Sequence, residues 1–222
     1  MMSIKKAIFK LNFFSNLEEN EVDKLCAISS FKRYSSDLLL HYEKSQSKNL
    51  LFLVNGLAKA YKIDKHDNEI FLYYVYSNQM LSELSTLKAD KLLSYSNIIF
   101  VEESEILSID YEVFKREFLD KGLLCLELAN EIIRQSKQLQ DLVNREFIFD
   151  SVSKVSKMLH SDVEMFNKLK RYDVSLMLHI QPSTLSRVLS RLKRQGIIDI
   201  DHGEVIIVDA KALETIYEGL AI

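Results

Sequence analysis

Arginine and serine side chains alternate with leucines between Pro182 and Gln195, and this mixture has a specific chemical use. The apolar residues recur at the i, i+3, i+4, i+7 spacing of a buried helix face: Leu185, Val188, Leu189 and Leu192. The opposite face carries Ser183, Ser186, Arg187, Ser190, Arg191 and Arg194. Small serines let a helix backbone approach another molecule closely, and arginine can donate two hydrogen bonds to O6 and N7 of guanine. We therefore predict that Ser183, Ser186 and Arg187 contact base edges in a major groove.

Basic residues are concentrated around this helix, although the 222-residue chain has a net charge of −3. Within residues 166–198, Asp173 stands alone against Lys168, Lys170, Arg171, Arg187, Arg191, Lys193 and Arg194. A local excess of positive charge is typical of a polyanion site, and a solvated helix face is the alternative. We expect the DNA phosphates to be contacted by Lys170, Arg171, Gln181, Thr184, Arg191 and Arg194.

The residues on either side predict how this helix is held. Asp150 can cap a helix carrying the apolar residues of 152–159, and a short helix follows over 173–178. A tight turn at 179–181 leads to Pro182, the first residue of the exposed helix, and Gly196 ends it. Residues 197–200 and 204–208 then form a β-hairpin. This order predicts a winged helix-turn-helix. A protein-binding winged helix is the alternative, because Asp199, Asp201 and Glu204 suit phosphate contact poorly.

A long helix without Gly or Pro is expected from Leu123 to about Asn144. Its apolar residues follow the alternating spacing of a coiled-coil seam, which predicts a homodimer interface made of Cys125, Leu128, Ile132, Gln135, Leu139 and Leu142. One helix packed on its own domain is the alternative.

Residues 31–109 contain short apolar runs separated by polar turns. This spacing predicts an antiparallel β-roll, after a helical segment over residues 1–30. The fold class expected is α+β, with a β-roll sensor domain at 1–121, a dimerisation helix and hinge at 122–147, and a DNA-binding domain at 148–222.

Composition excludes several classes of protein. With 47% hydrophobic and 27% charged residues the chain is that of a globular protein. It has no apolar run of membrane-spanning length and no signal-peptide core, so we expect it in the cytoplasm and not at a membrane. Cys26 and Cys125 cannot form a disulfide framework or a four-thiolate metal site.

The segment Gln181-Pro182-Ser183-Thr184-Leu185-Ser186-Arg187-Val188-Leu189 resembles the recognition helix of the Crp/Fnr family of bacterial transcription regulators. Residues 173–180 and 192–208 are also similar to that family, as is the order of roll, long helix and winged helix. The resemblance implies a homodimer on an inverted-repeat operator, a signal received at the roll, and contact with RNA polymerase. Ser183 stands where the Fnr-like branch carries a glutamate, so a different operator is expected.

The same resemblance argues against cyclic nucleotides as the signal. Family members that bind them have a Gly-Glu-Leu segment and, ten residues after the glutamate, an Arg-Ser pair. This chain has Ser82-Glu83-Leu84 and Leu93-Ser94, so Leu93 replaces the arginine that pairs with the phosphate. Glu83, Leu84, Leu93 and Ser94 are retained as a candidate effector pocket.

No cofactor can be assigned from the sequence. The sequence is compatible with four alternatives: haem ligation by His41, His66 or Cys26, a thiol switch at Cys125, a small apolar ligand, or no effector. It also does not distinguish an activator from a repressor. A metalloenzyme built on the roll is the contrasting hypothesis, but the histidines at 41, 66, 160, 179 and 202 are scattered and form no His-x-His pair. We therefore expect no enzyme activity and no metal site.

Overall fold

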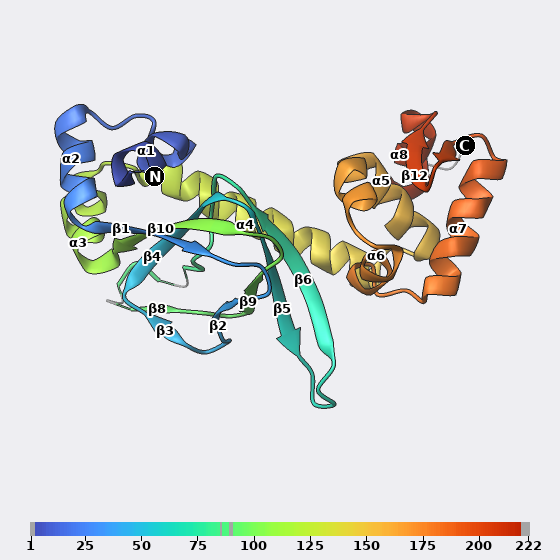
Figure 1. The fold of residues 1–222 in the computed structure, drawn as a ribbon, viewed down its shortest axis with the longest axis horizontal. Helices are drawn as coiled ribbons and strands as arrows, with labels where there is room; N and C mark the ends of the chain where they lie inside the picture. Colours follow the sequence, from blue (N-terminus) through green and yellow to red (C-terminus); the bar gives the residue numbers. More distant parts are fainter. Residues whose placement is uncertain (1–2, 85, 89–90, 219–222) are drawn as a thin grey trace. The chain divides into compact units, whose positions relative to one another are not determined.

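The computed structural model describes residues 3–84, 86–88 and 91–218 (Figure 1). The chain divides into two compact units, Met1–Gln138 and Leu139–Ile222. The division falls within a long helix, α4 (Cys125–Phe147). The three-part organisation expected from the sequence stays a prediction.

The first unit is an antiparallel β-roll with helices gathered at one end (Figure 1). One sheet has the order β1-β10-β4-β7, a second has the order β2-β9-β5-β6, and β3 pairs with β8. The strands are β1 (Ser29–Tyr34), β2 (Leu39–His41), β3 (Gln46–Ser47), β4 (Asn49–Asn55), β5 (Leu57–Ile63), β6 (Glu69–Tyr76), β7 (Gln79–Met80), β8 (Leu92–Leu93), β9 (Asn97–Phe100) and β10 (Ser104–Asp110). The helices are α1 (Ile4–Lys10), η1 (Asn12–Phe14), α2 (Glu19–Ala27), α3 (Tyr111–Glu117) and η2 (Leu119–Lys121). The expected roll and α+β class are confirmed.

Two turns show why the strands end where they do. Between β5 and β6 the carboxylate of Asp64 accepts hydrogen bonds from the backbone N–H groups of His66 and Asn68, which closes a tight connection. Between β4 and β5 the chain passes Gly56 at φ +109°, where a β-carbon would collide with Ser104. The strands β1, β2, β3, β7 and β8 were not predicted, since they lack a continuous apolar run.

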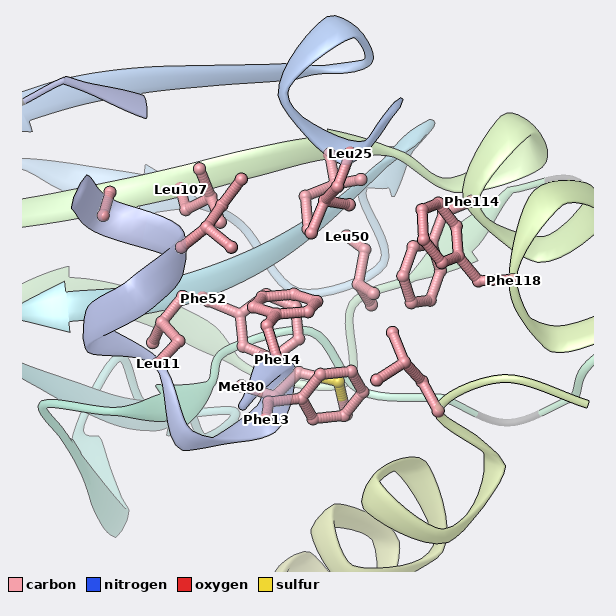
Figure 2. Packing of buried hydrophobic residues seen from close by; sticks show 14 of the residues in the cluster. Leu11, Phe13, Phe14, Leu25, Leu50, Phe52, Met80, Leu107, Phe114 and Phe118 are labelled. Carbon is pink, nitrogen blue, oxygen red and sulfur yellow. The ribbon is translucent and has the colours of Figure 1, made fainter. Parts of the chain in front are cut away.

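An apolar core joins the N-terminal segment to the roll (Figure 2). The rings of Phe13 and Phe14 lie 4.9 and 5.1 Å from the ring of Phe52 on β4. In the same core, the rings of Phe114 and Phe118 stack on each other with their centroids 5.3 Å apart. Burial of these large side chains fixes the N-terminal helices and α3 on the roll, which supplies a rigid base for the start of α4.

One face of α4 binds the roll of its own subunit. Arg134 Nη2 donates to Met80 O at 3.2 Å, Gln135 Nε2 donates to Ser82 O at 3.0 Å, and Gln138 Nε2 donates to Tyr74 O at 3.1 Å. Leu128 is 4% exposed and belongs to the core of the roll. The first part of α4 is therefore a component of the first unit.

The second unit is a bundle of helices with a two-stranded hairpin. Its elements are α5 (Ser151–Lys168), α6 (Arg171–Met177), α7 (Pro182–Arg194), β11 (Ile198–Asp201), β12 (Glu204–Ile207) and α8 (Ala210–Glu218). The carboxylate of Asp150 accepts from Ser153 N at 2.8 Å, which confirms the expected cap of α5. Gly196 follows α7 at φ +71°, in the left-handed conformation that ends many helices.

Two features of this unit were not predicted. Helix α5 bends at Asp162, whose backbone is not helical and whose carboxylate accepts from Met165 N at 2.9 Å. Helix α8 packs on α5 through buried Leu213, and the hydroxyl of Tyr217 lies 2.9 Å from His160 Nδ1.

None of the helices in the described ranges has both the length and the apolar character that crossing a membrane requires.

Candidate nucleic-acid interface

Helix α7 has one buried and one exposed face. Gln181 precedes it in an extended conformation, and Pro182 occupies its first turn, where a missing N–H group has no partner to lose. The buried face is made of Leu185, Val188, Leu189 and Leu192. The exposed face presents Ser183, Ser186, Arg187, Ser190, Arg191 and Arg194, as the sequence predicts. The burial holds the helix so that its polar side faces outward.

The serines on the exposed face are tied to the helix itself. Ser186 Oγ donates to Pro182 O at 3.1 Å, and Ser190 Oγ donates to Ser186 O at 2.9 Å. These bonds use the hydroxyl proton and leave oxygen lone pairs to accept hydrogen bonds from outside. The surface around the arginines is therefore made of short side chains that offer hydrogen-bond acceptors.

Two of the basic residues expected to form the patch have structural partners. Arg171 Nη1 donates to Phe166 O at 3.0 Å, Arg171 Nη2 donates to Gly203 O at 2.6 Å, and its guanidinium lies over the ring of Phe166. Lys193 Nζ lies 2.8 Å from Asp199 Oδ1 and also donates to Ile200 O. Burial lowers the pKa of Arg171.

Arg171 thus ties the end of α5 to the tip of the hairpin, and the phosphate contact expected of it stays a prediction. The side chains of Lys170, Gln181, Arg191 and Arg194 remain exposed. Thr184 is half-buried, and its hydroxyl accepts a hydrogen bond from Arg187 at 3.1 Å. The basic surface is narrower than the sequence suggests and is centred on α7.

The hairpin β11–β12 presents acidic side chains. Asp199, Asp201 and Glu204 are exposed, and the hydrogen bond from Lys193 lowers the pKa of Asp199. Asn167 holds the hairpin to α5, since its side chain donates to Val205 O and accepts from Val205 N, both at 2.9 Å. A rigid, acidic hairpin is poorly suited to phosphate contact, so the candidate interface is α7 and not the wing.

The exposed apolar row on α4 differs from the predicted seam by one residue at three positions. Leu128 lies in the roll core and Gln135 binds Ser82, so neither side chain is available to a partner. Leu142 is half-buried. Ile132 and Leu139 are 41% and 53% exposed, and Val143 is also exposed. With Cys125, Ala129 and Ser136 they form a row at heptad spacing, which we call the outer row: Cys125, Ala129, Ile132, Ser136, Leu139 and Val143.

One of the candidate effector residues, Glu83, has a carboxylate that accepts three hydrogen bonds from the protein. Glu83 Oε1 accepts from the hydroxyl of Tyr73 at 2.7 Å and from Ser96 Oγ at 3.3 Å, and Glu83 Oε2 accepts from Tyr95 N at 2.6 Å. Burial, together with the negative charge of Glu83, raises the pKa of Tyr73. Tyr73 therefore keeps its proton and donates it to the carboxylate. Both oxygens of Glu83 are engaged by the protein.

The other candidate pocket residues have ordinary structural places. Leu93 lies in β8 opposite Gln46 of β3 and carries no charge. Ser94 N donates to Ser45 O, and the two serine hydroxyls lie 3.4 Å apart. Leu84 packs against the apolar core.

Comparisons with known proteins found similarities over both units. Residues 153–216 match the model of the Crp-like helix-turn-helix domain. Over 214 residues the chain is 23% identical to the cyclic AMP receptor protein of Thermus thermophilus, covering 94% of this chain and 97% of that one. These matches support a transcription regulator of the Crp/Fnr type with a Crp-like helix-turn-helix domain. The resemblance stated from the sequence is confirmed.

Solved structures share the fold at low identity. A mutant of CooA from Carboxydothermus hydrogenoformans is similar with a TM-score of 0.67 and 20% identity, covering 92% of this chain and 94% of that one. FixK2 from Bradyrhizobium japonicum is similar with a TM-score of 0.64 and 14% identity, covering 85% and 97%.

The residues considered for other kinds of sensing are separated. Cys26 is half-buried and burial raises the pKa of its thiol, whereas Cys125 is exposed and lies 3.5 Å from Leu119 O. His66 lies in the exposed turn between β5 and β6. Within the ranges that the structure describes, no three His, Cys, Asp or Glu side chains are grouped as a metal site requires.

Sequence reasoning missed the partners that decide which cations are free. Arg171 and Lys193 look like Arg191 and Arg194 in a count of charges. Apart from Phe166 O, their carbonyl and carboxylate partners come from the hairpin, up to 32 residues along the chain. The acidic character of that hairpin was the one available signal, because a nearby acid can neutralise a lysine.

Proposed function

We propose that this Crp/Fnr-type regulator acts as a homodimer that binds an inverted-repeat operator in double-stranded DNA. The observation that carries the proposal is the exposed face of α7, where serines and arginines are presented without an acid by a helix whose other face is buried. Half-sites about 10 base pairs apart would place two such helices in successive major grooves on one side of the duplex.

The side chains of the exposed face divide into two roles. Ser183, Ser186 and Arg187 lie in the first half of α7, the part of a recognition helix that reaches base edges. Lys170, Gln181, Arg191 and Arg194 surround them and contact phosphates, which carry no sequence information but supply affinity. The proposed set omits Arg171, and Thr184 supports Arg187.

Dimerisation is assigned to the outer row of α4. Exposed apolar residues at heptad spacing are unfavourable in water and are covered when two parallel helices pair. Linking two DNA-binding units in this way raises affinity for a two-fold symmetric site, because the second contact becomes intramolecular.

We propose further that the roll receives a signal other than a cyclic nucleotide. A buried cyclic phosphate needs a cation to offset its desolvation, and Leu93 offers none. The ribose hydroxyls would also have to compete with Tyr73, Ser96 and the Tyr95 N–H group, which already donate to Glu83. A regulator of this kind would act in the cytoplasm, in contact with RNA polymerase.

The test is selection of binding sites from a random pool of duplex DNA by the full chain, together with its mass by sedimentation. We expect a dimer and a selected inverted repeat. Selection of no sequence would favour a protein-binding winged helix, and selection of a single half-site by a monomer would exclude the dimeric operator.

A further inference from the structure

The last turn of α4 is bound to the turn between α6 and α7. Glu146 Oε2 lies 2.9 Å from Nδ1 of His179, and Glu146 Oε1 accepts from Arg145 Nε at 3.1 Å. All three side chains are mostly buried, and all belong to the second unit. Each oxygen of the carboxylate therefore has its own partner.

The protonation of this pair follows from its chemistry. A carboxylate only accepts hydrogen bonds, so His179 must carry a proton on Nδ1. Burial would raise the pKa of Glu146, but the bonds from His179 and Arg145 outweigh it and lower that pKa. Glu146 is thus charged near neutral pH, and the bond from His179 is charge-assisted.

The backbone does not explain why a histidine stands at this turn. His179 has φ +51°, in the left-handed region where a side chain with a β-carbon is strained and glycine is not. Its Nε2 is buried and has no hydrogen-bond partner among the described residues. The strained backbone and the unpartnered Nε2 both disfavour histidine at this position. A functional role for the contact between Nδ1 and Glu146 would explain why histidine is nevertheless present.

We propose that Glu146 and His179 form a joint that fixes the direction of the recognition helix α7 relative to the end of α4. Between α4 and α5 the chain has only the residues 148–150, and the joint adds a second, polar connection directly to the turn that starts α7. This inference rests on the proposed function, because α4 is the helix through which the two subunits pair. A fixed direction of α7 sets the half-site separation that the dimer accepts.

The variant His179→Gly separates this role from simple folding. Glycine relieves the left-handed strain and so maintains or raises the melting temperature, but it removes the bond to Glu146. The matched control is His202→Gly, since His202 also has a positive φ and lies 2.8 Å from an acid, Asp201, but at the exposed tip of the hairpin. Glu146→Ala removes the other half of the joint without changing the turn.

The measurement is affinity for operators in which one base pair is inserted or deleted between the half-sites, which turns one half-site by about 35° relative to the other. The natural chain and His202→Gly should lose roughly tenfold or more in affinity for the altered spacings. His179→Gly and Glu146→Ala should bind the best spacing more weakly and lose no more than about threefold at the others. The double variant should behave as the single ones do.

The outcomes separate the two proposals. If the natural chain selects no inverted repeat, the proposed dimeric operator fails and the joint falls with it. If the natural chain discriminates between spacings and both joint variants discriminate equally well, the dimeric operator stands and the joint is excluded.

Discussion

The guanidinium of Arg187 donates from Nη2 to the hydroxyl of Thr184, 3.1 Å away and three residues earlier on α7. This bond holds the guanidinium against the first turn of the helix. Four of the five guanidinium N–H groups need other partners, so the side chain can still donate a bidentate pair. Thr184 is thus a positioning residue for Arg187.

Replacing Arg187 by alanine should cost about 1–3 kcal/mol of binding free energy and relax the preference at one base pair in each half-site. Thr184→Val should weaken the same preference to a smaller extent, because it removes the hydroxyl and keeps the shape, whereas Thr184→Ser should preserve it. Site selection with the three variants measures this. An unchanged base preference in Arg187→Ala would remove this residue from base reading.

Arg191 and Lys193 should differ in their effect on salt dependence. Arg191→Ala should weaken binding to all sequences alike and reduce the slope of log K against log salt by about 0.9, the value for one phosphate contact. Lys193→Ala should change the slope by less, since Asp199 already pairs with Lys193 at 2.8 Å. Titrations at several salt concentrations test this, and equal slopes for the two variants would contradict the narrowed basic surface.

The outer row of α4 predicts which positions crosslink. In a background with both cysteines replaced by serine, Ile132→Cys should form a disulfide between subunits under mild oxidation, because a residue of the central row meets its own copy across a two-fold axis. Gln138→Cys is the matched control, since Gln138 faces its own roll. Efficient crosslinking of the control alone would place the interface on another face.

Charge in the same row should separate the subunits. Ile132→Glu with Leu139→Glu should give monomers and lower operator affinity by roughly 10²-fold or more, the avidity that linkage supplies. Sedimentation and a gel-shift titration measure the two effects. A double variant that remains dimeric and binds normally would exclude the outer row.

The α4 seam shows how far the sequence could be followed. Apolar spacing placed the helix and three of its exposed residues, Cys125, Ile132 and Leu139. It could not show which side faces the roll, because that depends on bonds such as that of Gln135 to Ser82, 53 residues away. A leucine at heptad spacing, such as Leu128, can pack equally well in the core of its own roll or in an interface between two subunits.

The same limit applies to Arg171 and to Glu83. Helix periodicity and Pro182 were sufficient to predict α7 and its exposed face, since these depend on local spacing. The partners of Arg171 and Glu83 come from other elements brought together by the fold. Local pattern predicts the elements and the faces, and tertiary contacts decide which polar groups on them are free.

Calorimetric titration of the full chain with cyclic AMP or cyclic GMP should show no heat of specific binding. Leu93 cannot pair with a phosphate, and both carboxylate oxygens of Glu83 already accept hydrogen bonds from Tyr73, Tyr95 or Ser96. A saturable signal at submicromolar concentration would contradict this prediction. Loss of that signal in Lys88→Ala or Lys91→Ala would then identify the cation that replaces the arginine.

The stability of the roll should depend on pH through His41. This residue lies in β2 opposite Ile98 of β9, and burial lowers its pKa below the ordinary value near 6.5, an effect that the charge of Glu83 partly offsets. Between pH 6.5 and the lower folded pKa the unfolded chain binds more protons at this site than the folded chain. The contribution of His41 to the free energy of unfolding is therefore complete above about pH 6.5 and is lost as the pH falls through that window.

The variant His41→Gln should accordingly lose less stability between pH 7.5 and 5.5 than the natural chain does. Urea denaturation followed by tyrosine fluorescence reports mainly on the roll, because the chain has no tryptophan and most of its ten tyrosines lie in the first unit. His202→Gln is the control, since the side chain of His202 is 94% exposed and lies in the second unit. Parallel pH curves for the natural chain and His41→Gln would mean that His41 exchanges protons equally in both states.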